Sequence, residues 1–344
     1  MEATANPSGL LPAAETGAPL GLIEKARVVA ALGAAVVILY TMGWISAQPT
    51  DPALPLTFVR SGRAIPAIWP ALAILTVVAG IIGTIVSGKR LPEAGLFAAA
   101  IGLAALSLHG GSMFDLMANE GATTPAVRAA FMKAMAIDCV LWSAVMFVTW
   151  IATSWAYRWI WFGPNAPASP SASAASTEPL APTQPTAKSG RSQSKQQAKP
   201  AVQAPRSGWA ALVVTGVIGV FVVWCTAGRD PAAPVQRGQT IAAVAAGLYF
   251  GAMGGRYFTG IRDVRWYLLA VPAGAILAWL VGYLSADMSW AQGTPYQYYI
   301  YLATTPVHDL ARPLPIEYIA VGTAAVLAGF WGGDKMEQVA ADAL

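Results

Sequence analysis

Charged residues are scarce in this chain, because Asp, Glu, Lys and Arg make up 11% of its 344 residues. Soluble globular domains carry roughly 25% charged residues. The chain therefore has less than half of the usual charge, which excludes an ordinary soluble enzyme. The same shortage excludes a nucleic-acid binder, although the net charge is +4.

Cysteine and histidine are also rare. Two cysteines, Cys139 and Cys225, exclude a disulfide scaffold and a cysteine-based zinc or iron–sulfur site. Two histidines, His109 and His308, leave little for a haem or a metal centre. The sequence has no phosphate-binding loop, no nucleophile elbow and no His-Glu-x-x-His motif. We therefore expect no cofactor, no metal and no catalytic residues, and the chain is not predicted to be an enzyme.

Hydrophobic residues, in contrast, make up 56% of the chain and gather in long runs. A bilayer core about 30 Å thick needs roughly 20 mostly apolar residues per helix. The runs are continuous, rich in Ala, Leu and Gly, and do not alternate, which favours helices over strands. We expect eight transmembrane helices, at residues 28–45, 65–86, 95–112, 135–155, 209–226, 240–255, 266–284 and 316–331.

A segment of Pro, Ala, Ser, Thr, Gln and Lys divides the expected helices four and four. This composition buries too little apolar surface to offset the entropy of ordering, so we expect a disordered, flexible linker. The predicted domains are a disordered cytoplasmic segment 1–25, a four-helix membrane unit 26–162, the linker 163–207, a second four-helix membrane unit 208–333 and a short C-terminal tail 334–344.

The two four-helix units resemble each other in sequence. Asp51-Pro-Ala-Leu-Pro55 follows the first expected helix, and Asp230-Pro-Ala-Ala-Pro234 follows the fifth. Thr123-Thr-Pro125 precedes the fourth helix, and Thr304-Thr-Pro306 precedes the eighth, at nearly the same separation along the chain. The common order predicts a tandem duplication, and an even number of spans gives both units the same orientation. The predicted fold is an all-α membrane protein of two parallel four-helix repeats related by a pseudo-two-fold axis.

Lysine and arginine are distributed unequally between the two expected sides of the membrane. Of the 21 residues, 14 fall on the side of the termini and the linker, and 7 fall on the other side. Because cytoplasmic loops carry an excess of Lys and Arg, we expect both termini and the linker in the cytoplasm and the protein in a plasma or inner membrane. The linker supplies five of the 14, and long segments are weaker indicators of orientation.

Small residues recur at every fourth position in the second and sixth expected helices. Residues four apart lie on one helix face, and small side chains let helix backbones approach closely in lipid. Either glycine is simply frequent in such helices, or these faces form close contacts at equivalent places, including contacts with each other. The predicted helix-packing faces are Thr76, Gly80, Thr84 and Gly88, and Ala243, Gly247, Gly251 and Gly255.

Asp138 is the only acid clearly inside an expected span. A charge at that depth is expensive, so the side chain should face the bundle and find a partner or stay protonated. Two interpretations remain open: an ion or proton site, and a structural group paired with Lys133 or Arg128. The register that aligns Thr123 with Thr304 places Glu317 two positions from the equivalent of Asp138, so the halves offer acids at nearly, but not strictly, equivalent positions.

The last expected outer loop, 285–315, is rich in aromatic residues. Aromatic side chains gather at the membrane interface and also at surfaces that contact partners. The loop is therefore either an interfacial segment or a docking surface. Its aromatic residues are Trp290, Tyr296, Tyr298, Tyr299 and Tyr301.

These features favour a non-catalytic, multi-pass membrane protein that acts as a scaffold or accessory subunit of a membrane assembly. Its expected partners are the lipid bilayer and either another membrane protein or a second copy of the chain, and nucleic acid is not expected. The alternative is a permease or channel for an ion or a small molecule, built on the duplicated unit. Few polar side chains lie within the expected spans, which weighs against that alternative.

Overall fold

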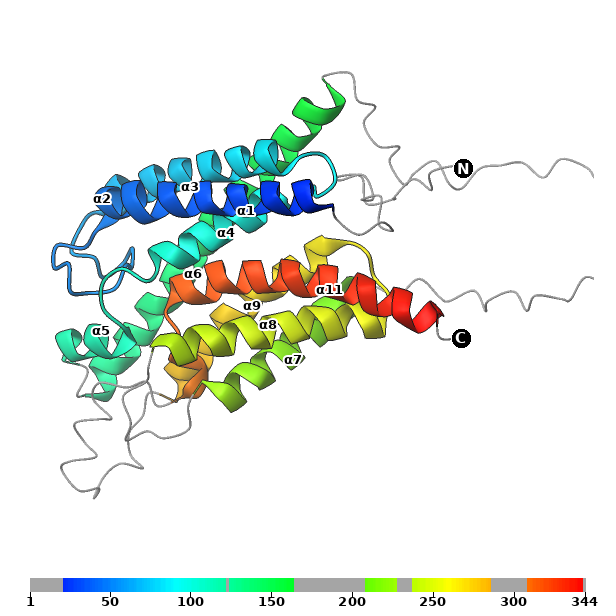
Figure 1. Ribbon diagram of the computed structural model, residues 1–344. Helices are drawn as coiled ribbons and strands as arrows, with labels where there is room; N and C mark the ends of the chain where they lie inside the picture. The colour runs from blue at the N-terminus through cyan, green and yellow to red at the C-terminus, as the bar shows by residue number, and fades with distance from the viewer. Residues whose placement is uncertain (1–20, 122–123, 164–207, 228–236, 286–307, 343–344) are drawn as a thin grey trace, which may run out of the picture.

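The computed structural model describes residues 21–121, 124–163, 208–227, 237–285 and 308–342. The regular elements within these ranges are all helices, and no strand occurs in them. The expectation of an all-α protein is therefore confirmed for this part of the chain. Figure 1 shows the helices in order, coloured from blue to red along the sequence.

The N-terminal part of the chain begins with one long apolar helix. A π-helical segment joins its two α-helical pieces without a break, so that residues 22–47 form a single rod. A long non-helical connection follows, and then four further helices. The elements are α1 (Leu22–Val37), η1 (Ile38–Gly43), α2 (Trp44–Ala47), α3 (Ile65–Ser87), α4 (Ala94–Leu106), α5 (Met113–Glu120) and α6 (Pro125–Phe162).

The described residues of the C-terminal part form four long helices and one short turn of helix. Pro272 lies inside α9, and a π-helical segment leads into α11. The elements are α7 (Gly208–Thr226), α8 (Arg237–Thr259), α9 (Val264–Leu284), η4 (Asp309–Ala311), η5 (Glu317–Val321) and α11 (Gly322–Asp342).

Five of the described helices are long and apolar enough to cross a membrane: residues 22–47, α3, α6, α7 and α9. These five helices are compatible with a membrane location. α4 is apolar but has only 13 residues. α8 is rich in Gly and Ala and carries Arg237 and Arg256, and α11 includes charged residues in its second half, so neither has the composition of a clear span.

The longest helix, α6, extends well beyond the apolar run that predicted it. The Thr124 hydroxyl oxygen accepts a hydrogen bond from the backbone N–H of Val127 at 3.3 Å, which caps the first turn. Pro125 stands at the first helical position, where a missing N–H costs nothing. The helix has 38 residues and is about 57 Å long at 1.5 Å per residue. The expected span 135–155 therefore covers only the middle of α6.

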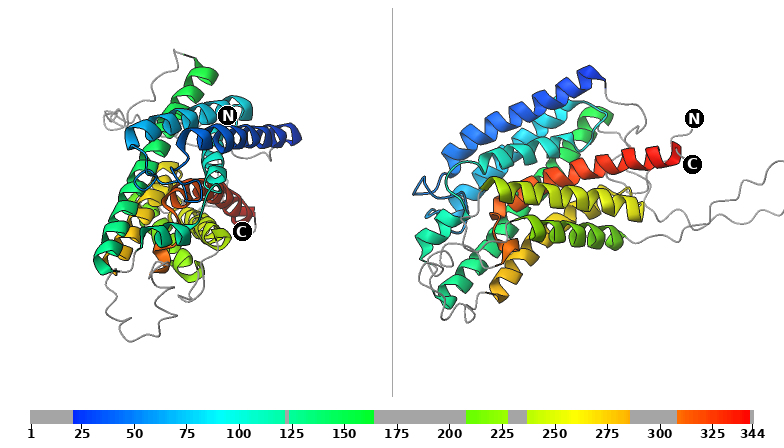
Figure 2. Two further views of the ribbon diagram at one scale, coloured as in Figure 1. Left: turned by 90° about the vertical axis from the view of Figure 1, so that its left-hand side faces the viewer. Right: turned by 60° about the horizontal axis from the view of Figure 1, so that its bottom comes forward.

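The helices form two groups that pack against each other (Figure 1, Figure 2). In the first group, α3 packs against α1, α4 and α6, and α1 also packs against α4. In the second group, α8 packs against α7 and α11, and α9 packs against α7 and α11. The groups meet where α6 packs on α9 and where α4 packs on η5 and α11. The candidate sites described below lie at or beside these meeting places.

Candidate functional site

The first candidate site is Asp138 on α6, whose side chain is completely buried. Its Oδ1 atom accepts hydrogen bonds from the backbone N–H groups of Phe58 at 2.6 Å and Val59 at 3.1 Å. Its Oδ2 atom accepts a hydrogen bond from the indole Nε1 of Trp142 at 3.0 Å. Asp138 thus holds a segment that lies 80 residues away in the sequence.

The segment bound by Asp138 belongs to the connection between α2 and α3, whose central part is buried although it is not helical. Buried backbone N–H groups need partners, and the carboxylate provides one for two of them. The ring of Phe58 also packs on Trp142, with centroids 4.3 Å apart. The expected pairing of Asp138 with Lys133 or Arg128 is therefore wrong, because backbone amides and an indole take that place.

Glu317, at the start of η5, is a second buried acid among the described residues. Its Oε1 atom forms an ion pair with Nε of Arg237 at 3.0 Å. Its Oε2 atom accepts hydrogen bonds from the Thr240 hydroxyl at 3.2 Å and from the backbone N–H of Leu314 at 3.0 Å. Both carboxylate oxygens are therefore occupied by donors from the surrounding fold.

Arg237, the first residue of α8, carries this network into the other group of helices. Its Nη1 atom donates hydrogen bonds to the carbonyl oxygens of Leu108 at 3.3 Å and Gly110 at 3.1 Å, just beyond the end of α4. A buried carboxylate paired with arginine needs such additional hydrogen bonds to offset the loss of water. The Glu317–Arg237 pair thus links the N-terminus of α8 to both helix groups.

Sequence reasoning did not single out Arg237, but a signal for it was present. Asp138 and Glu317 are separated along the chain by the same interval as Asp51 and Asp230, which begin the first repeated motif. Phe58 and Arg237, which bind the two acids, are separated by that interval as well. Aligning the two halves by the Asp51 and Asp230 motifs, rather than by the Thr123 and Thr304 motifs, would therefore have matched Asp138 with Glu317 and Phe58 with Arg237.

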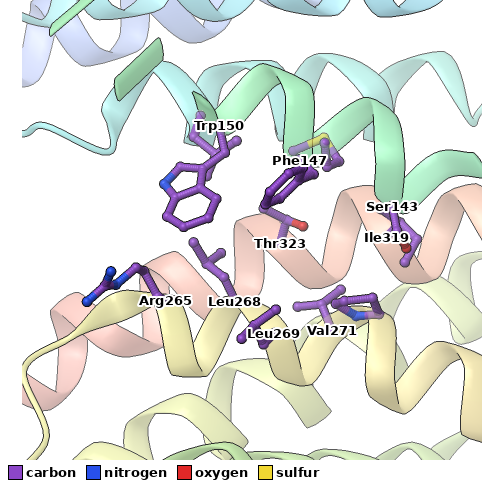
Figure 3. A pocket seen from close by; sticks show the side chains of 12 residues that line it. Ser143, Phe147, Trp150, Arg265, Leu268, Leu269, Val271, Ile319 and Thr323 are labelled. Carbon is purple, nitrogen blue, oxygen red and sulfur yellow. The ribbon is translucent and has the colours of Figure 1, made fainter. Parts of the chain in front are cut away.

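The second candidate site is an apolar pocket between the two helix groups (Figure 3). α4 and α6 form one wall, and α9, η5 and α11 form the other. Its empty volume is about 470 Å³, including the open side. Most lining residues are apolar, and they include Leu96, Phe147, Leu268 and Ile319. No sequence signal indicated this pocket, because its walls come from separate helices.

Polar groups are few in the pocket wall. The Ser143 hydroxyl donates a hydrogen bond to the carbonyl oxygen of Cys139 at 2.6 Å, so it is satisfied within α6. Arg265 lies at one end of the pocket, as Figure 3 shows. Its Nη2 and Nε atoms bond the Asp263 carboxylate at 2.6 to 2.9 Å. The pocket is therefore apolar along its length, with a charged pair at one end.

The two small-residue faces lie against different neighbours. A Cβ atom added to Gly80 on α3 would lie 2.7 Å from Thr153 of α6. A Cβ atom added to Gly251 on α8 would lie 2.6 Å from the carbonyl oxygen of Thr215 and 3.1 Å from the backbone nitrogen of Gly219, both on α7. Both glycines thus mark close helix approaches, but the nearest atoms belong to α6 in one case and to α7 in the other. At these glycines the two faces do not contact each other.

The remaining small residues of these faces occupy two kinds of position. Thr76, Thr84 and Ala243 are buried. Gly247 and Gly255 also approach α7 closely. Gly88 differs, because it ends α3 with a φ of 86° and lies in a left-handed conformation that favours glycine. It is a helix-terminating residue in this fold rather than part of a packing face.

Several sequence-predicted features lie outside the described residues. These are the aromatic residues Trp290, Tyr296, Tyr298, Tyr299 and Tyr301, the Asp230 and Thr304 motifs, and linker residues 164–207. Within the described ranges, no three His, Cys, Asp or Glu side chains gather as they would around a metal ion. Cys139 and Cys225 are free thiols.

The arrangement can therefore do two things chemically. The buried acids hold backbone and side-chain donors in place, and the pocket can take up an apolar group next to a charged pair. No protein-family model, no curated protein and no solved structure matches this chain, so its function is inferred from its own residues.

Proposed function

We propose that this protein is a non-catalytic integral membrane protein that serves as a scaffold or accessory subunit of a membrane assembly. The observation that carries this proposal is the use of the two buried acids, Asp138 and Glu317. Each accepts hydrogen bonds from donors of the fold itself. An acid in a transport path must exchange partners with its cargo. Carboxylates whose oxygens are already occupied by three donors are better suited to a structural role.

An apolar face along α6 supports a role in assembly. Trp155 and Trp159 lie four residues apart on this face, with ring centroids 6.1 Å apart, and both are more than half exposed. Exposed aromatic residues are frequent anchors of protein–protein contacts. The exposed apolar residues of α6 are Val127, Ile137, Val140, Phe147, Val148, Ile151, Trp155, Trp159, Ile160 and Phe162.

We further propose that the chain is a tandem duplication of a four-helix membrane unit, in which α4, α8 and α11 cross the membrane beside the five longer apolar helices. The pattern of helix contacts supports this proposal, because α3 packs against α1 and α6 as α8 packs against α7 and α11. In the same way, α4 packs against α1 as α9 packs against α7. The two acids and the positions that bind them add to it, since both pairs share one separation along the chain.

The contacts between the groups also fit a pseudo-two-fold axis along the membrane normal. Such an axis exchanges α6 with η5–α11 and α4 with α9. It therefore relates the packing of α6 on α9 to the packing of α11 and η5 on α4, and both contacts are present. The start of α1 and the end of α11 lie at the same end of the bundle (Figure 1), as cytoplasmic positions for both termini require. The pseudo-symmetry is that of parallel repeats.

Purification of the full-length chain from its native membrane in lipid nanodiscs tests the scaffold role. We expect a second protein or a second copy of the chain to copurify. Replacing Trp155 and Trp159 together by Ala should release the partner, whereas Phe221→Ala on α7, where the side chain is similarly exposed, should not. A chain that remains alone, with neither partner nor self-association, would contradict the proposal.

Reconstitution into liposomes tests the permease alternative. Ion and proton fluxes are measured for the wild-type chain and for Asp138→Asn, with the folded fraction of each sample determined by circular dichroism. We expect no flux that depends on Asp138. A flux in the wild-type chain that disappears in an equally folded Asp138→Asn sample would refute the structural role and favour a permease.

A further inference from the structure

We propose that the pocket between α6 and α9 binds one acyl chain of an anionic phospholipid, whose headgroup lies beside Arg265. This proposal rests on the membrane location of the five apolar helices and not on the scaffold role. Its first support is the position of the pocket between the two helix groups, where α4, α6, α9 and α11 come together. The residues that line the pocket come from all four of these helices and from η5, and all but three of them are apolar.

The second support is the direction in which the pocket opens. Phe147 on α6 and Leu269 on α9 are 53% and 45% exposed, whereas Val271 and Thr323 at the inner wall are buried. The pocket therefore opens between α6 and α9 toward the side of the bundle. In a bilayer this side faces lipid, and lipid acyl chains are the apolar groups present there in quantity.

The third support is the length and depth of the pocket. Along α9 it extends from Arg265, the second residue of the helix, to Pro272. Seven residues of helix correspond to about 10 Å, which is about two thirds of the hydrocarbon thickness of one leaflet. An acyl chain whose headgroup lies beside Arg265 can therefore lie along the apolar wall and run toward the centre of the bilayer. Figure 3 shows Arg265 at one end of the row of apolar side chains.

The fourth support is the charge at the end of the pocket. Arg265 is the one charged residue among the described residues that line the pocket. Asp263 bonds the Nε and Nη2 atoms of Arg265 and so positions that guanidinium, whose Nη1 atom donates no hydrogen bond to another described residue. Basic pockets between transmembrane helices on the cytoplasmic side are suited to anionic headgroups. An arginine at this end of the pocket favours an anionic lipid over a zwitterionic one.

Photolabelling tests the occupant. The probe is phosphatidylglycerol with a diazirine in one acyl chain, mixed into nanodiscs that contain the full-length protein, and the labelled peptides are identified by mass spectrometry. We expect label to concentrate on residues 143–150 of α6 and 268–272 of α9. Label spread evenly over all lipid-facing helices would overturn the proposal, because it would mean that the pocket holds no particular chain.

A matched pair of substitutions separates pocket occupancy from general lipid contact. Ser143→Phe places a large side chain in the pocket, whereas Ala144→Phe makes the same kind of change one position along α6, outside the lining residues. We expect Ser143→Phe to reduce labelling of α9 about tenfold and Ala144→Phe to leave it unchanged. If Ser143→Phe does not fold, Leu269→Trp at the exposed rim replaces it. Equal labelling in a pocket variant and in Ala144→Phe would overturn the proposal.

The headgroup preference is tested by native mass spectrometry with phosphatidylglycerol and phosphatidylcholine. One arginine near a membrane surface is worth about 1 kcal/mol toward an anionic lipid, which is about fivefold in affinity. We therefore expect Arg265→Gln to lower the preference for phosphatidylglycerol about fivefold, whereas Arg63→Gln, on an exposed residue before α3, should leave it unchanged. An unchanged preference in Arg265→Gln would refute the headgroup assignment.

Discussion

Replacing Asp138 by Ala removes the acceptor of three N–H groups in one step. The affected donors are the backbone amides of Phe58 and Val59 and the indole of Trp142. Hydrogen bonds within membranes average about 0.6 kcal/mol each, which gives about 2 kcal/mol for three. Leaving a buried donor without a partner costs about 1 to 3 kcal/mol. We therefore expect the free energy of unfolding to fall by at least about 2 kcal/mol, and by up to about 9 kcal/mol if all three donors stay without a partner.

Asp138→Asn provides a sharper version of the same test. Its amide oxygen keeps an acceptor for the two backbone N–H groups, but its NH₂ group then faces the N–H of Trp142. We expect a loss of about 1 to 3 kcal/mol. Trp142→Phe removes the indole donor and relieves this conflict. The double variant should therefore be less destabilised than the sum of the single variants, by about 1 kcal/mol.

Reversible unfolding in mixed detergent micelles, followed by far-ultraviolet circular dichroism, measures these differences without relying on tryptophan fluorescence. Two results would refute the reasoning. The first is an Asp138→Ala variant as stable as the wild-type chain, which would mean that water or another group satisfies the donors. The second is strict additivity in the double variant, which would mean that Asp138 and Trp142 do not interact.

Three further predictions concern other described residues. Gly251→Ala should lower stability by about 1 to 3 kcal/mol, because its Cβ would meet the α7 backbone, whereas Gly216→Ala, with open space around it, should be neutral or stabilising in the same unfolding assay. Glu317→Gln should cost up to about 3 kcal/mol, because it leaves the partly buried Arg237 without its counter-charge, and adding Arg237→Gln should recover part of that loss; no recovery would argue against the pair. Burial lowers the pKa of His308 below its ordinary value of 6.5, so the unfolded chain binds more protons there. Stability should therefore fall as the pH drops below about 6.5, and a thermal-unfolding series should show a smaller fall in His308→Asn.

The positions of the long helices were predictable from the sequence, whereas their ends were not. Each of the eight expected apolar runs overlaps a helix, because apolar runs are what a membrane helix requires. The ends depend on local capping that hydropathy does not register. α6 begins ten residues before its expected span because Thr124 and Pro125 start it early. α4 stops at Leu106, six residues before the expected end of its span.

The partners of the candidate site were less predictable than the site itself. Asp138 was identified because an acid in an apolar run is expensive. Its partners could not be identified in the same way. Two of them are backbone amides in a connection 80 residues away, and a backbone amide has no side chain by which a sequence pattern could reveal it. Glu317 was noted only as an acid at a position nearly, but not strictly, equivalent to that of Asp138. The pocket depends on which helices pack together, and that information is absent from any single helix.

The unequal lengths of α6 and α7 have a consequence for the surrounding bilayer. α7 has 19 residues and is about 28 Å long, so it crosses a hydrocarbon core of about 30 Å only when nearly upright. α6, at about 57 Å, exceeds the core even at a tilt of about 40°. The thickness of the bilayer around the protein is therefore expected to be uneven. The bilayer should be thinner beside α7, whereas α6 places little constraint on its thickness. A membrane much thicker than the reach of α7 would disfavour this protein, so bilayer thickness becomes a factor in where the chain can reside.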